Sequence, residues 1–146
     1  MRQFLFAPLA LLCLLALPAT AQESRPFTQG PVIQVTDVRV MDGQFDNYMR
    51  YLQSTYKPLM EAQKKAGIIV DYGVYSRRPR STQDGNMYLT VVYPNMAAFD
   101  GLDDRVEPIS RKISGLTREQ AAKAGVERAS MRTILGSELI RTLELK

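Results

Sequence analysis

The sequence predicts an α+β domain whose elements run in the order strand, helix, strand, strand, helices, strand. Two observations support this prediction at the N-terminal side. The segment "PVIQVTDVRVM" at residues 31–41 is rich in β-branched residues, and a long stripe with helical spacing follows it. On the C-terminal side, the two apolar runs "IIVDYGVYS" and "MYLTVVY" flank a polar loop, as expected for a hairpin.

The first 21 residues predict a secretory signal peptide. Arg2 precedes an apolar run at residues 4–17, and the small-residue triplet "ATA" follows, so cleavage is expected after Ala21. The run is shorter than the roughly 20 residues that span a bilayer. Leucines rather than a small residue precede Cys13, which argues against lipidation. We therefore expect a periplasmic or secreted protein without stable membrane insertion, with an uncleaved anchor as the alternative.

The mature chain is expected to start with a flexible leader and to continue as one domain. Residues 22–30 are polar and contain Pro and Gly, which is typical of a loose terminus. The domain then covers residues 31–146, a length sufficient for a hydrophobic core without disulfides. Its first strand is expected at residues 31–41.

A helix is expected between Gly43 and Gly67. Its apolar side chains share one stripe with amphipathic spacing, and they are Phe45, Met49, Leu52, Tyr56 and Leu59. Gly67 stands where a left-handed C-cap is needed. Pro58 lies inside the helix and removes the hydrogen bond to the Ser54 carbonyl, at a cost of about 3 kcal/mol in a straight helix. We expect a bend that fits the helix to a twisted sheet, with a ligand site as the alternative.

The second half of the domain is predicted from strand and capping signals. Strands are expected at residues 68–76 and 87–93, joined by a hairpin whose loop contains Asp84 and Gly85. Asn95 is expected to cap a short helix, and Thr117 with Gln120 matches the capping box of a further helix. The segment "GSELIRTLELK" at residues 136–146 is the closing strand.

Composition excludes several classes of site. The chain has 19 Lys and Arg, 15 Asp and Glu, no His and no Trp, and its one cysteine lies in the segment to be cleaved. A Ser-His-Asp triad, a cysteine nucleophile, an imidazole-bound haem and an ordinary zinc site are therefore excluded. No dinucleotide or phosphate-binding motif is present. We expect no metal and no cofactor, so any catalysis would depend on Asp, Glu, Tyr, Arg or Lys.

Basic residues are spread along the chain, with one cluster in the segment "RRPR" at residues 77–80. No aromatic residue is interleaved with these arginines, which favours a solvated hairpin loop over an anion or nucleic-acid site. No nucleic-acid partner is expected.

The segments "VRVMDGQFDNYMRYL", "PLMEAQKKAGIIVDYGVY" and "MYLTVVYPNMAAFDGL" together resemble the dimeric α/β-barrel group of ferredoxin-like domains, which includes antibiotic-biosynthesis-monooxygenase-like domains of unknown function. The resemblance covers about residues 31–146. It implies a βαββαβ fold with a four-stranded antiparallel sheet. It also implies a homodimer in which two sheets pack face to face, with the helices outside.

If the chain forms such a dimer, strand alternation selects the side chains of the inter-sheet cavity. Valines of the strands and Tyr72 are expected under the helices. The opposite set is expected to line the cavity: Asp37, Arg39, Asp71, Tyr75, Tyr88 and Thr90. Asp71 and Tyr75 are the candidate catalytic pair, because burial would raise the pKa of the Asp71 carboxyl and make it a base. Arg39 is expected to hold an anionic ligand group or to neutralise Asp37.

Three functions follow from this arrangement. The first is a homodimer that binds a small, partly apolar or aromatic molecule between its sheets. The second is a cofactor-independent oxygenase or isomerase, because cofactor-free oxygenation of an activated phenol, as in monooxygenase members of the resembled group, would fit these residues. The third is a structural or interaction dimer, in which the polar groups pair across the interface and the tyrosines fill it. The sequence leaves open whether the protein is an enzyme.

Overall fold

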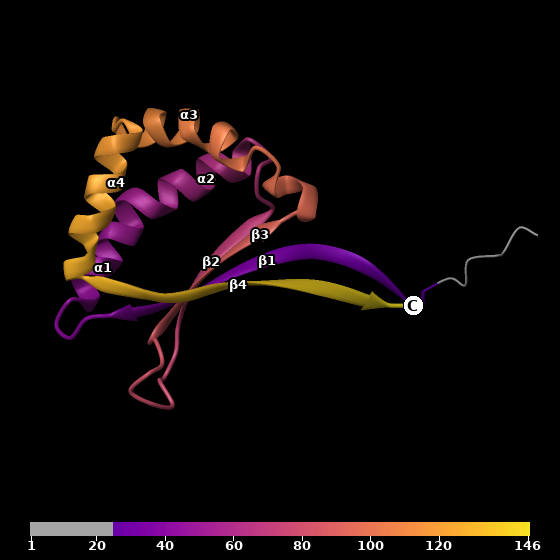
Figure 1. The fold of residues 1–146 in the computed structure, drawn as a ribbon, viewed down its shortest axis with the longest axis horizontal. Helices are drawn as coiled ribbons and strands as arrows, with labels where there is room; N and C mark the ends of the chain where they lie inside the picture. The colour runs from indigo at the N-terminus through magenta and orange to yellow at the C-terminus, as the bar shows by residue number, and fades with distance from the viewer. Residues whose placement is uncertain (1–24) are drawn as a thin grey trace, which may run out of the picture.

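The computed structural model describes residues 25–146, which form a four-stranded antiparallel sheet with the helices on one face (Figure 1). The predicted signal peptide at residues 1–21 lies outside the described residues. The strands are β1 (Phe27–Val40), β2 (Asp71–Ser76), β3 (Met87–Tyr93) and β4 (Arg132–Leu145), in the spatial order β2-β3-β1-β4. The long helices are α1 (Phe45–Tyr51), α2 (Lys57–Lys65), α3 (Leu102–Ser114) and α4 (Arg118–Glu127). The predicted βαββαβ order is confirmed.

Strands β1 and β4 are both longer than expected. They pair along their whole length, from Phe27 with Leu145 to Val40 with Arg132, and continue as a two-stranded ribbon beyond the helices (Figure 1). The Lys146 N–H donates to the Pro26 carbonyl at 3.0 Å, so the two ends of the described chain lie side by side. The predicted leader at residues 22–30 is therefore wrong for its last four residues, since pairing with the C-terminal strand orders them.

The helix that crosses the sheet is interrupted rather than simply bent. Residues Leu52–Tyr56 form a π-helical segment, η1, between α1 and α2, in which the Lys57 N–H donates to the Leu52 carbonyl. Pro58 follows in the first turn of α2, where a missing N–H costs little. The sequence predicted one continuous helix that contains Pro58. The π-helical hydrogen-bond spacing before Pro58 accommodates this residue instead.

The extra residue of the π turn also shifts the buried stripe. Tyr48, Leu52 and Met60 are buried, whereas the expected stripe members Phe45 and Met49 are exposed. One core cluster centres on Tyr48, Leu52 and three sheet residues, namely Val38, Val40 and Met87. A second cluster gathers around the end of α2 and the start of β2, namely Met60, Ile68, Ile69, Tyr93 and Ala98. Both clusters lie between the helices and the sheet.

Several local predictions are confirmed. Gly67 ends the α2 region with a φ of +70°. The Asn95 carboxamide accepts the Ala98 N–H at 3.1 Å and starts the short helix η2 (Met96–Phe99). Thr117 and Gln120 form the capping box of α4. These signals are local in sequence, so they survive any change in tertiary packing.

Helices α3 and α4 form an outer layer over α1 and α2 (Figure 1). Neither α3 nor α4 contains a buried residue, in contrast to α1 and α2. A one-turn 3₁₀ helix, η3 (Arg128–Ser130), leads from α4 into β4. None of the helices within residues 25–146 is long and apolar enough to cross a membrane.

Candidate functional site

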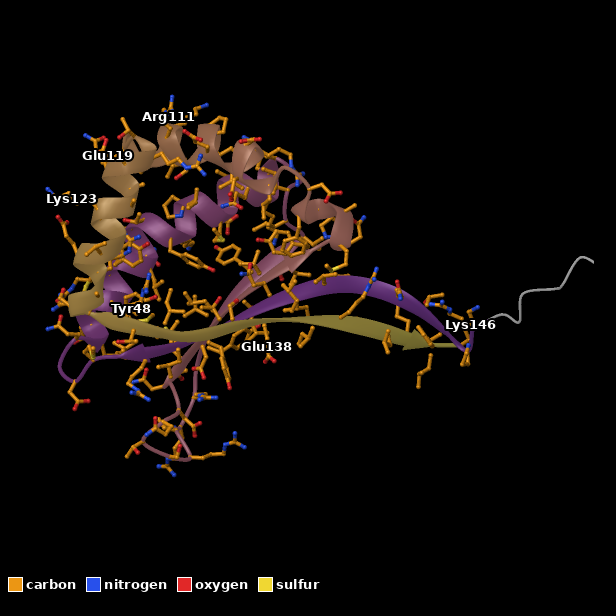
Figure 2. The ribbon with its side chains drawn as sticks, viewed as in Figure 1. Tyr48, Arg111, Glu119, Lys123, Glu138 and Lys146 are labelled. Atoms are coloured by element: carbon orange, nitrogen blue, oxygen red, sulfur yellow. The ribbon has the colours of Figure 1, made fainter. Side chains whose placement is uncertain are left out.

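The sheet face opposite the helices, here called the open face, carries most of the side chains singled out from the sequence. Tyr48 lies on the helix side in Figure 2, whereas Glu138 projects from the opposite side of β4. Strand pairing arranges the open face in three cross-strand rows. The first contains Tyr75, Tyr88, Asp37 and Gly136, the second Gly73, Thr90, Val35 and Glu138, and the third Asp71, Val92, Ile33 and Ile140.

Arg77 is the centre of the polar contacts on the open face. Its Nη2 lies 3.2 Å from Asp37 Oδ2, and its Nη1 donates to the Tyr88 hydroxyl. The guanidinium also covers the Tyr88 ring, 4.5 Å from the ring centre. Only 17% of the Arg77 side chain and 29% of the Asp37 side chain are exposed. The three residues therefore form a partly desolvated cluster, here called the Arg77 cluster, in which the ion pair is stronger than one at the surface.

The loop at residues 77–86, here called the arginine loop, holds this cluster from one side. The Arg77 Nε donates to the Gly85 carbonyl at 2.7 Å, and Arg77 Nη2 lies 3.6 Å from Asp84 Oδ1. The Asp84 carboxylate in turn accepts the N–H groups of Arg80 and Ser81 at 2.9 and 3.0 Å. These hydrogen bonds, that of Arg80 above all, hold the pKa of Asp84 below its usual value. The arginine loop projects from the open face as a wall (Figure 1).

One oxygen of Asp37 has no hydrogen-bond partner among the described residues. Asp37 Oδ1 is buried against Gly85, where a Cβ would lie 2.0 Å from it and 2.5 Å from the Val38 carbonyl oxygen. Only glycine allows the arginine loop to approach this closely. A buried carboxylate oxygen without a donor is unfavourable, so the close approach of Gly85 to Asp37 has a cost in stability.

A hollow of about 310 Å³ lies beside the Arg77 cluster, over β1 and β4. Its walls combine apolar, aromatic and acidic side chains: Val35, Asp37, Tyr88, Leu135, Gly136, Ser137 and Glu138. Leu135 is available to the hollow because the pairing of β1 and β4 is irregular there, with a shift between Asp37 and Val38. The volume is at the lower end of the range of small-molecule sites.

Tyr75 borders the cluster from the edge strand β2. It faces Tyr88 directly across the strands, and 56% of it is exposed. Its ring lies over Gly73, where a Cβ would come within 2.4 Å of the ring. Tyr75 thus lies flat on the sheet, and Thr90, the neighbour of Gly73 on β3, shares the same face.

Two predicted site residues have other roles. Asp71 forms an ion pair with Lys64 at 2.8 Å and its side chain is 61% exposed. This hydrogen bond lowers the pKa of Asp71, so the expectation of a buried base with a raised pKa is wrong. Arg39 donates to the Thr82 carbonyl at 2.8 Å and lies 3.4 Å from the Asp84 carbonyl. Its guanidinium holds the arginine loop and does not neutralise Asp37, which pairs with Arg77 instead.

Arg39 also lines a larger hollow, a groove of about 600 Å³ between the end of β1 and the arginine loop. Its polar walls come mainly from the loop itself, and the Arg39 guanidinium already donates to loop carbonyls. We therefore regard the smaller hollow beside Asp37 as the candidate functional site.

The tyrosines divide between the two faces of the sheet. Tyr75 and Tyr88 lie on the open face, whereas five others pack under the helices: Tyr48, Tyr51, Tyr56, Tyr72 and Tyr93. Burial raises the pKa of the Tyr56 hydroxyl, which has no hydrogen-bond partner among the described residues. The Tyr72 hydroxyl donates to Glu61 at 2.7 Å, which raises its pKa to about 12. Most of the tyrosines therefore build the core.

Sequence reasoning missed Arg77, the central residue of the site, and Glu138. Arg77 was grouped with the solvated arginines of the hairpin loop. It nevertheless continues the alternation of Asp71, Gly73 and Tyr75 along β2, and this period of two could have placed it on the open face. Within residues 25–146 no group of three His, Cys, Asp or Glu side chains is arranged to hold a metal ion.

No protein-family model and no curated protein sequence matches the chain. Similar solved structures exist at low identity. HapK from Hahella chejuensis is 12% identical, with a TM-score of 0.50 over 76% of this chain and 91% of that one. A dimeric ferredoxin-like protein from an uncultured marine organism is 10% identical, with a TM-score of 0.48 over 82% of this chain and 98% of its own. One of unknown function from Thermobifida fusca is 12% identical, with a TM-score of 0.45 over 82% and 95%.

The likeness to HapK concerns the fold alone. The element order and the antiparallel sheet order β2-β3-β1-β4 confirm the ferredoxin-like α+β fold predicted from the sequence.

Proposed function

We propose that the protein is an exported homodimer that binds a small, partly apolar or aromatic molecule between its two sheets. The observation that carries this proposal is the open face itself, an uncovered sheet surface with apolar residues around the Arg77 cluster. Ile140 and Leu135 are 46% and 38% exposed there. Soluble monomers rarely leave large contiguous apolar patches uncovered.

A second copy suits this face better than solvent does. Two sheets pack about 10 Å apart when their side chains interdigitate. The row of Ile33, Val92 and Ile140 supplies apolar contact, whereas Gly136 leaves space beside Asp37. The hollow of one protomer would be closed by the partner, with the arginine loop as its wall.

The chemistry of the hollow defines its ligand. Val35 and Leu135 suit an apolar or aromatic body, and the exposed Glu138 carboxylate accepts hydrogen bonds. The nearest guanidinium, that of Arg77, is already paired with Asp37. We therefore expect a ligand with a hydrogen-bond donor, such as a phenol or an aromatic amine, in preference to an aromatic acid.

Thermal-shift screening of the mature protein tests the binding proposal. The library should contain phenols, aromatic amines and aromatic acids of matched size. We expect phenols or amines to raise the melting temperature without turnover, and Asp37→Asn with Tyr88→Phe to abolish the rise. Asp71→Asn is the matched control, because Asp71 pairs with Lys64 at the sheet edge. Turnover of a hit would instead favour a cofactor-independent oxygenase or isomerase. Silence across the library would favour a purely structural dimer.

Export is the second part of the proposal, and it depends on the apolar segment and the "ATA" triplet before Gln22. Intact-mass analysis of protein from the periplasm or medium should give a chain that begins at Gln22. A full-length chain retained in the membrane would contradict export.

A further inference from the structure

A second, smaller cavity lies on the other side of the sheet, between the inner and outer helix layers. It has a volume of about 90 Å³ and is lined from both layers. Tyr51, Thr55 and Leu59 come from the α1–η1–α2 helix. The outer helices, the α3–α4 connection and η3 supply the rest: Ser110, Ile113, Ser114, Leu116, Ala121 and Arg128. This cavity, here called the helix-layer cavity, is separate from the open face.

Arg128 is the charged residue of the helix-layer cavity. Its guanidinium lies over the Tyr51 ring, 4.9 Å from the ring centre, and Tyr51 stacks on Tyr48 at 5.8 Å. Arg132 lies over the Tyr48 ring in turn, at 5.7 Å. Two cations thus flank one tyrosine pair at the junction of α1, η3 and β4.

Neither cation has an acidic partner among the described residues. The Nε atoms of Arg128 and Arg132 are both buried without a hydrogen-bond partner, and neither arginine forms an ion pair within residues 25–146. Tyrosine rings offset part of the cost of partly burying a guanidinium, but they leave its N–H donors unsatisfied. The Nε–H of Arg128 is therefore a charged donor at the cavity without an acceptor among the described residues.

The remaining lining matches the two ends of a small organic acid. Hydroxyl groups come from Thr55, Ser110 and Ser114, and apolar side chains from Leu59, Ile113 and Leu116. A carboxylate could accept from Arg128 while a short aliphatic tail contacts the apolar side. The volume of about 90 Å³ restricts the occupant to a small molecule of a few heavy atoms.

A route from solvent is visible in the outer layer. A second hollow of about 200 Å³ lies between α3 and α4 and shares Ser110, Leu116 and Ala121 with the helix-layer cavity. Leu102, Val106 and Ile109 of α3 pack against the second core cluster, whereas α4 has no buried residue, so α4 is the part of the outer layer that can move at lower cost. The charged side chains Arg111, Glu119 and Lys123 point outward from this layer (Figure 2).

We propose that the helix-layer cavity is a binding site for a short-chain aliphatic carboxylate, held by Arg128. The site is independent of the inter-sheet ligand, since it lies under α3 and α4 and shares no lining residue with the hollow beside Asp37.

The probe is isobutyrate, with isobutyramide as the uncharged control, titrated into the ¹⁵N-labelled mature protein. We expect saturable shifts of amide signals in η1, α3 and η3, and binding of isobutyramide weaker by about tenfold or more. If isobutyrate produces no saturable shifts, or shifts only signals of the open face and the arginine loop, the proposal is overturned.

Two variants test whether isobutyrate binding needs the Arg128 charge and the cavity space beside Ala121. Arg128→Met should weaken isobutyrate binding by about tenfold or more, whereas Lys123→Met, which removes an exposed positive charge of α4, should change it less than about twofold. Ala121→Leu should block the cavity and leave the melting temperature of the free protein unchanged or higher. This variant keeps the proposal testable if Arg128→Met does not fold. Undiminished binding in either Arg128→Met or Ala121→Leu would refute the assignment.

Arg77→Met should leave isobutyrate binding intact, which separates this site from the inter-sheet cavity.

Discussion

Arg77 contacts Tyr88 in two ways, since its guanidinium covers the Tyr88 ring at 4.5 Å and donates to the Tyr88 hydroxyl. The same guanidinium pairs with Asp37 from the neighbouring strand. Two strands of the sheet, β1 and β3, and the arginine loop are thereby joined at one cation. The position of the loop, and with it one wall of the candidate site, depends on this residue.

The first prediction concerns the shape of that cation. Arg77→Lys keeps the charge but loses the planar set of donors that reaches Asp37, Tyr88 and Gly85 together. We expect the free energy of unfolding to fall by about 1–2 kcal/mol in urea denaturation. Arg78→Lys, at an exposed position of the same loop, is the control and should change it by less than about 0.5 kcal/mol. Equal losses for the two variants would contradict a special role of Arg77.

The second prediction compares two glycines. Gly85→Ala places a Cβ 2.0 Å from Asp37 Oδ1, so the arginine loop must move and the free energy of unfolding should fall by about 1–3 kcal/mol. Gly136→Ala meets nothing within 4 Å in the protomer and should not destabilise it, since alanine restricts the unfolded chain. Chemical denaturation of both variants, fitted with a common slope, distinguishes these outcomes. A Gly85→Ala protein as stable as the wild type would show that the loop does not pack against Asp37 as described.

The third prediction concerns pH. The Lys64 hydrogen bond lowers the pKa of Asp71 below 3.8 and the same contact raises the pKa of Lys64. A carboxyl whose pKa is depressed by folding stabilises the fold above its unfolded pKa and loses that contribution as pH falls through the folded value. NMR titration of the side-chain carboxyls should therefore give both Asp71 and Asp84 pKa values below 3.8.

Lys64→Met provides the control for this titration. The pKa of Asp71 should return toward 3.8, whereas that of Asp84, which depends chiefly on the N–H of Arg80, should not move. A pKa of Asp71 above 3.8 in the wild type would restore this residue as a candidate base and contradict the ion pair.

The part of the site that could be predicted from the sequence depends on local geometry. Side chains alternate along a strand with a period of two, so Asp37, Tyr88 and Tyr75 were placed on one face before their pairing was known. The strand register then brings the three into one row. The same alternation extends one residue past β2 and includes Arg77. The run of arginines there suggested a solvated loop, so Arg77 was not predicted as a site residue.

The part that could not be predicted depends on contacts between distant segments. Asp71 pairs with Lys64, and this ion pair forms only because the end of α2 lies beside the start of β2. Met60 rather than the expected Leu59 is buried in α2, because the π turn adds one residue between it and Leu52. The ordering of residues 27–30 requires the C-terminal strand, more than a hundred residues away.

The central claim is that a second copy covers the open face, and light scattering on the mature protein tests it most directly. Ile140→Asp puts a charge on the open face at a residue that is 46% exposed in the protomer, so the protomer should still fold. Val126→Asp does the same at a 74% exposed position of α4, on the helix side. We predict twice the mass of the mature chain for the wild type and for Val126→Asp, and the mass of one chain for Ile140→Asp. A wild-type protein that is monomeric at micromolar concentration, or an Ile140→Asp variant that stays dimeric, would contradict the account.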